Sequence, residues 1–227
     1  MNFIPVLSTL VTFSFTYAVF RRYQKKGGTH LALWAFGLLL YGLGTLSEVW
    51  MSFAFNELVL KLWYLTGAML TAAWLGQGSI QLLVRKGKLA QILTYALAAF
   101  SLLALVMVAS APLTGAQSTY NVAGTISEQY KTILTRGGLT IFLTIILNIY
   151  GTLGLVGSAL YSAFLFWRKK VLANRMFGNI LIAAGALSPA LAGTFVKAGI
   201  VDALYVSEFI GAVLMFIGFM MATSGKE

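Results

Sequence analysis

The segment SEVWMSFAFNELVLKLWY, residues 47–64, places charged side chains within an apolar and aromatic run. Glu48 and Glu57 are two of the six acidic residues of the chain, and Lys61 follows Glu57 by four positions. A charged group in hydrocarbon is costly unless it faces the interior of a bundle, pairs with an opposite charge or reaches an interface. The segment therefore predicts the point where one membrane span ends and the next begins.

The rest of the chain has the composition of a membrane protein with several spans. Of its 227 residues, 59% are hydrophobic and only 10% are charged, whereas soluble domains carry roughly a quarter of their residues as charges. The mean hydropathy is +0.85. We predict an all-α membrane protein in which residues 1–227 form a single domain.

Apolar runs separated by charged breaks predict a bundle of seven transmembrane helices, since a hydrocarbon core about 30 Å thick needs roughly 20 apolar residues per helix. The first run lacks a basic region before it and a cleavage pattern after it, so we expect it to be retained. The predicted helices cover about residues 2–20, 29–50, 57–84, 89–111, 138–167, 174–197 and 202–223.

A polar segment at about residues 114–137 is the one sizeable connection between these helices. It is either a plain loop or the carrier of a short interfacial helix, because Ile126, Tyr130, Ile133 and Leu134 recur at helical spacing.

The basic residues predict the orientation of the bundle. Lysine and arginine flanking a span are retained in the cytoplasm, and twelve of the sixteen fall on one side of the predicted helices. The N-terminus is therefore expected outside and the C-terminus in the cytoplasm of a multi-pass cell-membrane protein. The net charge of +10 then faces anionic lipid headgroups, and no nucleic-acid partner is expected. The twelve are Arg21, Arg22, Lys25, Lys26, Arg85, Lys86, Lys88, Arg168, Lys169, Lys170, Arg175 and Lys226.

Several chemistries are disfavoured by residue types. Cysteine is absent, so thiolate metal sites and disulfides are excluded. The last predicted helix has no lysine before Lys226 to bind retinal, and the single histidine, His30, cannot supply paired haem ligands. Phosphate-binding, hydrolase and metalloprotease motifs are also missing. We therefore expect neither an enzyme nor a bound cofactor or metal.

The charged residues within the predicted spans or at their outer ends belong to the predicted outer half, and Glu208 lies about two turns inside the last helix. We hypothesise that an outward-facing cavity binds a ligand through Glu48, Lys61, Trp63 and Glu208, with Glu57 and Lys197 as counter-ions.

Structural roles for the same residues remain open. Glu57 and Lys61 have the i, i+4 order that favours a helical ion pair, and Trp63 suits an interfacial anchor. Glu208 could belong to a buried ion pair or remain protonated and hydrogen-bonded.

Other polar and small residues within the predicted spans suggest packing roles. Asn148 and Gln77 suit hydrogen bonds between helices, and Asp202 suits a helix cap. Pro189 predicts a kink that could act as a hinge. Within residues 151–158, Gly151, Gly154, Gly157 and Ser158 suit either internal packing or a homo-oligomer formed through the fifth helix.

The segments EVW, from Glu48, and LKLWYLTGAML, from Leu60, together with the seven-helix layout, resemble the membrane sensor module at the N-terminus of some bacterial histidine kinases. In that family the seventh helix passes a signal to a cytoplasmic output domain. The present sequence ends at Glu227, so the resemblance implies either a separate signalling partner or a longer chain.

We therefore expect a receptor-like module that binds a small molecule or lipid in the outer half of the bundle and signals through its last helix. The alternatives are a small-solute transporter, whose plan would be three helices, a linking fourth and three more, or a non-catalytic accessory subunit of a membrane complex.

Overall fold

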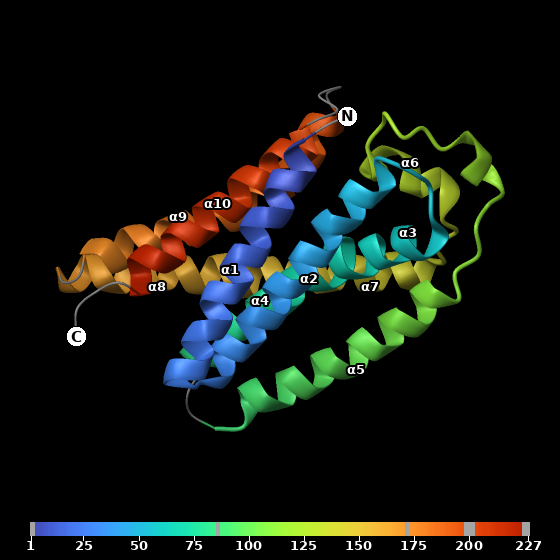
Figure 1. Cartoon of the computed structure of the whole chain (residues 1–227). Coiled ribbons are helices and arrows are strands. Elements are labelled where there is room, and N and C mark those ends of the chain that lie inside the picture. The colour runs from blue at the N-terminus through green and yellow to red at the C-terminus, as the bar shows by residue number, and fades with distance from the viewer. Residues whose placement is uncertain (1–2, 85–86, 171–172, 198–202, 224–227) are drawn as a thin grey trace.

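The computed structural model describes residues 3–84, 87–170, 173–197 and 203–223, with the side chains of 192–197 outside the description. Long helices occupy each predicted apolar run (Figure 1). Two of the spans contain π-helical segments. The elements are α1 (Ile4–Lys26), α2 (Thr29–Met51), α3 (Glu57–Trp63), η1 (Tyr64–Leu70), α4 (Thr71–Leu83), α5 (Leu89–Ala109), η2 (Ala116–Thr119), α6 (Ile126–Ile133), α7 (Gly138–Thr152), η3 (Leu153–Gly157), α8 (Ser158–Lys169), α9 (Ala173–Lys197) and α10 (Ala203–Thr223).

The architecture is that of a helical membrane bundle. Six helical stretches in the described part of the chain are long and apolar enough to cross a membrane: α1, α2, α3 through α4, α5, α7 through α8, and α10. The helix α9 is of similar length, 25 residues, and is rich in alanine and glycine; it is not among the six, and the side chains of its residues 192–197 lie outside the description.

The first helix is longer than predicted. It continues through Arg21 and Arg22 to Lys26, because lysine and arginine favour helices nearly as well as leucine. It ends only at Gly27, whose φ of 68° is a conformation that glycine adopts without strain. The hydrophobic run therefore marks where the apolar span stops, and the helix itself ends beyond it.

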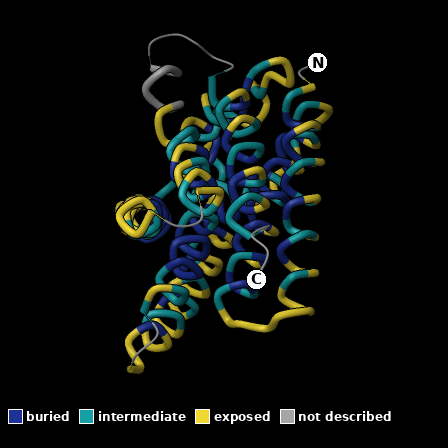
Figure 2. The backbone as a smooth tube through the Cα atoms, turned by 90° about the vertical axis from the view of Figure 1, so that its left-hand side faces the viewer, coloured by how far each residue is buried: buried dark blue, intermediate teal, exposed yellow. Residues whose placement is uncertain are grey.

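Six of the long helical stretches pack into a closed ring, and α5 lies outside it. The helix α1 packs against α2 and α10, α2 against α4, α4 against α7 and η3, α8 against α9, and α9 against α10. The helix α5 packs mainly on α4, η1 and α7 and runs along one side of the bundle (Figure 1). Its apolar side chains are exposed around much of its surface, which suits contact with lipid; they include Ile92, Tyr95, Leu102 and Val106. Figure 2 shows exposed positions on the outward faces and buried positions where helices meet.

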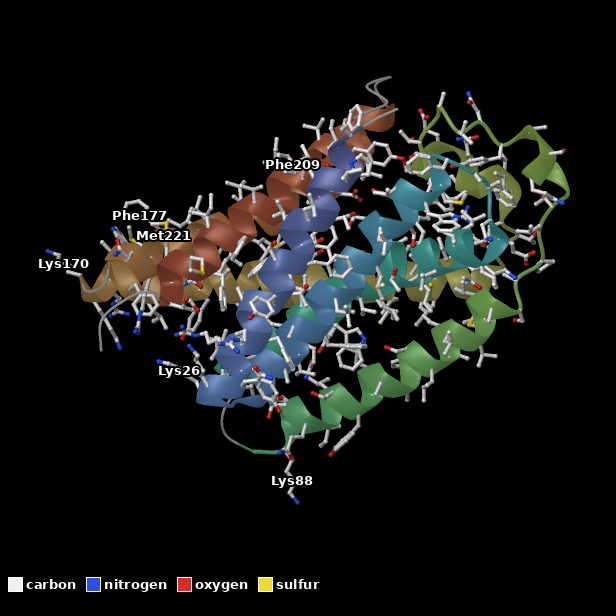
Figure 3. The ribbon with its side chains drawn as sticks, in the orientation of Figure 1. Lys26, Lys88, Lys170, Phe177, Phe209 and Met221 are labelled. Carbon is white, nitrogen blue, oxygen red and sulfur yellow. The ribbon has the colours of Figure 1, made fainter. Side chains whose placement is uncertain are left out.

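The two ends of the bundle differ in character. Lys26, Lys88 and Lys170 extend from the ends of α1, α5 and α8 along the same border of the molecule (Figure 3), which we call the basic end. The C-terminal end of α10 also lies there, since the Arg22 Nη2 donates to the carbonyl oxygen of Thr223 at 3.4 Å. The opposite end, which we call the loop end, carries the segment between α5 and α7 with its short helix α6.

Glycine allows the helix backbones to approach closely. A Cβ on Gly76 of α4 would lie 2.5 Å from the carbonyl oxygen of Gly151 of α7, and a Cβ on Gly151 would overlap the backbone of Ala72. Two further contacts join α9 to α10, where Gly185 meets Gly211 and Gly178 meets Gly218. Because lipid offers no hydrophobic driving force between helices, such close packing contributes much of their association.

The small residues of the fifth predicted helix thus pack mostly against another helix of the same chain. Gly151 and Gly154 face α4, whereas a Cβ on Gly157 would meet no atom within 4 Å. Self-association through this helix remains a prediction, with Gly157 as its exposed position.

We predict that Gly151→Ala lowers the free energy of unfolding by about 1–3 kcal/mol, because the added methyl group overlaps the α4 backbone. The matched control is Gly157→Ala, which adds the same group to the same span in open space and should leave stability unchanged or slightly higher. Thermal unfolding of the two variants in detergent measures the difference. Equal melting temperatures would contradict the proposed packing role of Gly151.

Candidate functional site

A cavity of about 400 Å³ lies among α2, the third span (α3, η1 and α4), the fifth span (α7, η3 and α8), α9 and α10. The short helix α6 lies at its edge. Much of its wall is apolar or made of small residues, and polar groups project from several helices. The polar and aromatic residues are Tyr41, Thr45, Glu48, Trp63, Thr71, Ser127, Tyr130, Lys131, Asn148, Thr152 and Glu208; the apolar and small residues are Gly44, Gly67, Ala68, Ala72, Leu75, Leu155, Ala186, Pro189, Ala190, Leu204 and Met215.

Two carboxyl groups from distant parts of the sequence meet in this cavity. Glu48 of α2 is only 2% exposed, and Glu208 of α10 is half-buried. Their carboxyl groups lie close enough to interact. The Oε2 atoms of both are shielded from solvent and meet no donor among the described residues. Two acceptor oxygens that face each other without a donor repel each other. A proton or a cationic group between them would remove this repulsion.

The other oxygen of Glu48 is held by an indole. Trp63 Nε1 donates to Glu48 Oε1 at 3.0 Å, and both side chains are buried. This contact joins α2 to the third span, between residues near the two ends of the segment 47–64. On the α10 side, the hydroxyl of Tyr41 donates to the backbone oxygen of Glu208 at 2.8 Å. The carboxyl group of Glu48 is therefore tied to the third span, and the backbone at Glu208 is tied to α2.

A π-helical segment shapes one wall of the cavity. In the wider turn of η1 the backbone N–H of Thr71 bonds to the oxygen of Thr66, five residues earlier, and side chains donate to two carbonyl groups of the segment. Thr71 Oγ1 donates to the oxygen of Thr66 at 2.8 Å, and Asn148 Nδ2 of α7 donates to the oxygen of Ala68 at 2.7 Å. The hydrogen bond that the sequence predicts for Asn148 between helices is thus confirmed. The second π segment, η3, contributes Leu155 to the same cavity.

The connection between α5 and α7 packs onto the loop end. Of the two alternatives for this connection, the short helix is present as α6, and Ile126 and Ile133 are each 1% exposed. It therefore packs against the bundle. The amide nitrogen of Ile126 donates to the hydroxyl oxygen of Tyr205 in α10 at 3.4 Å, and Tyr120 donates its hydroxyl to the oxygen of Met51 at 3.1 Å.

The surroundings of Tyr120 keep its phenol neutral. Burial, with the nearby charge of Glu48, raises the pKa of Tyr120 to about 12. The phenol therefore stays protonated throughout the physiological range and remains a hydrogen-bond donor to the oxygen of Met51 at the end of α2.

An aromatic cluster joins α6 to the cavity wall. The ring of Tyr130 lies 5.2 Å from that of Trp63 and 5.6 Å from that of Tyr64, centroid to centroid. The guanidinium of Arg136 lies 4.7 Å from the Tyr130 centroid, within the range of a cation–π interaction. Burial raises the pKa of Tyr130, and the charge of Arg136 opposes that shift. Tyr130 thus forms part of the cavity wall and also anchors α6.

The structure separates the charged residues that the sequence analysis grouped together. Glu48, Trp63 and Glu208 line one cavity. Lys61 does not; its Nζ lies 2.7 Å from Glu57 Oε1 and donates to the oxygen of Ala109 at 3.0 Å. The i, i+4 ion pair is therefore confirmed, and Lys61 lies outside the cavity because its chain reaches toward α5.

Three other predicted residues have different outcomes. The side chain of Lys197 and all of Asp202 lie outside the described residues. Pro189 lies within α9 on the cavity wall. Its ring approaches Gly211 of α10, where a Cβ would lie 3.2 Å from the proline Cδ. A hinge at this position remains a prediction.

Sequence reasoning missed several parts of the cavity. Tyr41 and Lys131 received no role, because a tyrosine in an apolar run and a lysine in a loop are common. Neither π segment was predicted, since the hydrophobic pattern does not distinguish a wide turn from an ordinary one. The spacing of Tyr130 with Ile126 and Ile133 was the one usable signal for α6.

Comparison of this chain with family models, with curated proteins and with solved structures finds no match.

We predict that Trp63→Phe destabilises the protein by about 1–3 kcal/mol, because it leaves Glu48 Oε1 buried without its donor. The matched control is Trp50→Phe, since Trp50 is 57% exposed on the neighbouring helix and its replacement should change stability by less than about 0.5 kcal/mol. Thermal unfolding in detergent compares them. Similar losses for both variants would argue against the Trp63–Glu48 hydrogen bond as a source of stability.

Proposed function

We propose that the chain is a receptor-like module of the cell membrane that binds a small molecule or a lipid in the cavity beside Glu48 and Glu208. The main support for this proposal is that Glu48, Trp63 and Glu208, which belong to three separate spans, line the same cavity. A cavity of about 400 Å³ falls within the roughly 300–1,000 Å³ usual for small-molecule sites, which are mostly apolar with a few convergent polar groups.

The proposed orientation has seven spans, with the loop end outside and the basic end in the cytoplasm. It follows the rule that lysine and arginine flanking spans are retained in the cytoplasm. Lys26, Lys88 and Lys170 together at one end support it (Figure 3). In this arrangement a ligand would enter beside α6 from outside, and anionic headgroups would lie against the basic end.

The proposed signal path is α10. This one continuous helix carries Glu208 at the cavity and reaches the basic end at Thr223, where it contacts Arg22 of α1. A ligand that contacts Glu208 differently in two positions of α10 would shift the balance between those positions. A cytoplasmic or membrane partner would then sense the end of α10.

We predict that native mass spectrometry of the protein, released gently from membrane, detects a small molecule or lipid at fixed stoichiometry. Ala186→Leu, which fills the cavity without changing its charge, should lose this molecule, because Ala186 lies on the wall. The matched control, Ala98→Leu, adds the same bulk to α5, and Ala98 does not line the cavity. Equal retention by both variants would place the bound molecule elsewhere and overturn the proposal.

A transporter is the second candidate, and the position of α5 favours it. The linking fourth helix lies outside the ring formed by the three long helical stretches on either side of it in sequence, as the three-plus-one-plus-three plan requires. Flux of a cavity-binding compound into proteoliposomes would decide between the two functions. Transport abolished by Ala186→Leu would favour the transporter, whereas binding without flux would favour the receptor.

A further inference from the structure

We infer that the ligand of the cavity is a small organic amine whose ammonium group lies between Glu48 and Glu208 and whose apolar part lies against Leu75, Leu155 and Met215. This inference rests on the proposed function, since it names the chemical class bound at the same site. It depends on the charge of the cavity, on its orphaned acceptors and on the nature of its remaining wall.

The charge of the described cavity wall is unbalanced. It carries two carboxyl groups, Glu48 and Glu208, and one basic side chain, Lys131. Lys131 is an exposed residue of α6, and its Nζ lies 5.9 Å from the ring centroid of Tyr130. The other nearby cations are engaged elsewhere, since Lys61 pairs with Glu57 and Arg136 stacks on Tyr130. A bound cation would therefore complete the electrostatics of the carboxyl pair.

The carboxyl oxygens without a hydrogen-bond partner favour a ligand that carries N–H donors as well as a positive charge. Glu48 Oε2 and Glu208 Oε2 are shielded and meet no donor among the described side chains, whereas Glu48 Oε1 already accepts from Trp63. A primary ammonium carries three N–H donors and can reach both oxygens. A quaternary ammonium carries the charge but no donor, so it should bind more weakly.

A metal ion fits this wall poorly. Within the described ranges no group of three or more histidine, cysteine, aspartate and glutamate side chains comes together. Hard divalent cations take about six oxygen ligands, and the carboxyl pair supplies few of them. The aromatic rings of Trp63 and Tyr130 on the same wall instead suit an organic cation, which their faces attract.

The rest of the cavity is suited to the apolar part of such an amine. Leu75, Leu155, Leu204 and Met215 line it together with the small side chains of Ala72 and Ala186. Asn148 and Thr71 spend their donors on the carbonyl groups of η1, so they add few free donors that would favour an anionic ligand.

The test uses the full chain in nanodiscs and four probes of similar chemistry: phenethylamine, phenethyl alcohol, hydrocinnamate and tetramethylammonium. Phenethylamine should bind at least about 10-fold more tightly than the other three, because only it combines charge, donors and an apolar body. Glu48→Gln and Glu208→Gln should each weaken its binding about 10-fold to 100-fold. Glu57→Gln is the matched control, since its carboxylate pairs with Lys61 outside the cavity, and it should leave binding unchanged. If the two cavity variants fail to fold, Ala186→Leu should abolish phenethylamine binding by bulk alone.

The outcomes separate the inference from the proposed function. Equal or tighter binding of the alcohol or of hydrocinnamate in the same cavity would overturn the amine and leave the receptor proposal standing. Failure of phenethylamine to bind, with a molecule retained in native mass spectrometry and lost in Ala186→Leu, would do the same. If no probe binds and no molecule is retained in native mass spectrometry, both the inference and the proposed function are overturned. The carboxyl pair would then be a structural pair that shares a proton.

Discussion

Close approach of helix backbones at glycine is the constraint on which the bundle depends. Lipid tails are as apolar as leucine, so helices in a membrane gain stability from van der Waals contact that improves as their axes approach. The helices α9 and α10 meet at two pairs, Gly185 with Gly211 and Gly178 with Gly218. The members of each helix are seven residues apart, which places them on one face of each helix. Gly76 and Gly151 make the equivalent contact between the third and fifth spans.

These contacts also explain where the cavity lies. Each glycine contact brings two helices together, and the space between one contacting pair of helices and the next stays open. Small residues on the facing walls, such as Gly67 and Ala186, leave room in that space. The π segment η1 widens one wall, and its carbonyl groups at Thr66 and Ala68 accept hydrogen bonds from the side chains of Thr71 and Asn148. The carboxyl groups of Glu48 and Glu208 thus lie in a space that helix packing leaves open. The segment between α5 and α7 covers this space with its aromatic residues.

Hydrophobic periodicity and charge predicted the helical runs because a lipid environment demands long apolar helices whatever their packing. The same information grouped Glu48, Trp63 and Glu208, since a charge deep in a span is costly and has to face an interior. It could not separate Lys61 from them, because a long lysine side chain near an interface can reach in several directions. Its direction toward Ala109 depends on where α5 lies. Glycines recur at a spacing of seven residues in both helices, at Gly178 and Gly185 and at Gly211 and Gly218, but this spacing does not indicate which helix each pair packs against.

The two carboxyl groups belong to different parts of the ring, and this gives the proposed ligand a mechanical role. Glu48 lies on α2, which packs on α1 and α4, whereas Glu208 lies on α10, which is interlocked with α9 by backbone contact at glycines. Interlocked helices move together more readily than they slide, because sliding would press backbone against backbone. A ligand that bridges Glu48 and Glu208 would therefore change the position of the α9–α10 pair relative to α2. Since α10 also contacts α1 through Arg22 and Thr223, a change made at the loop end would be felt at the basic end.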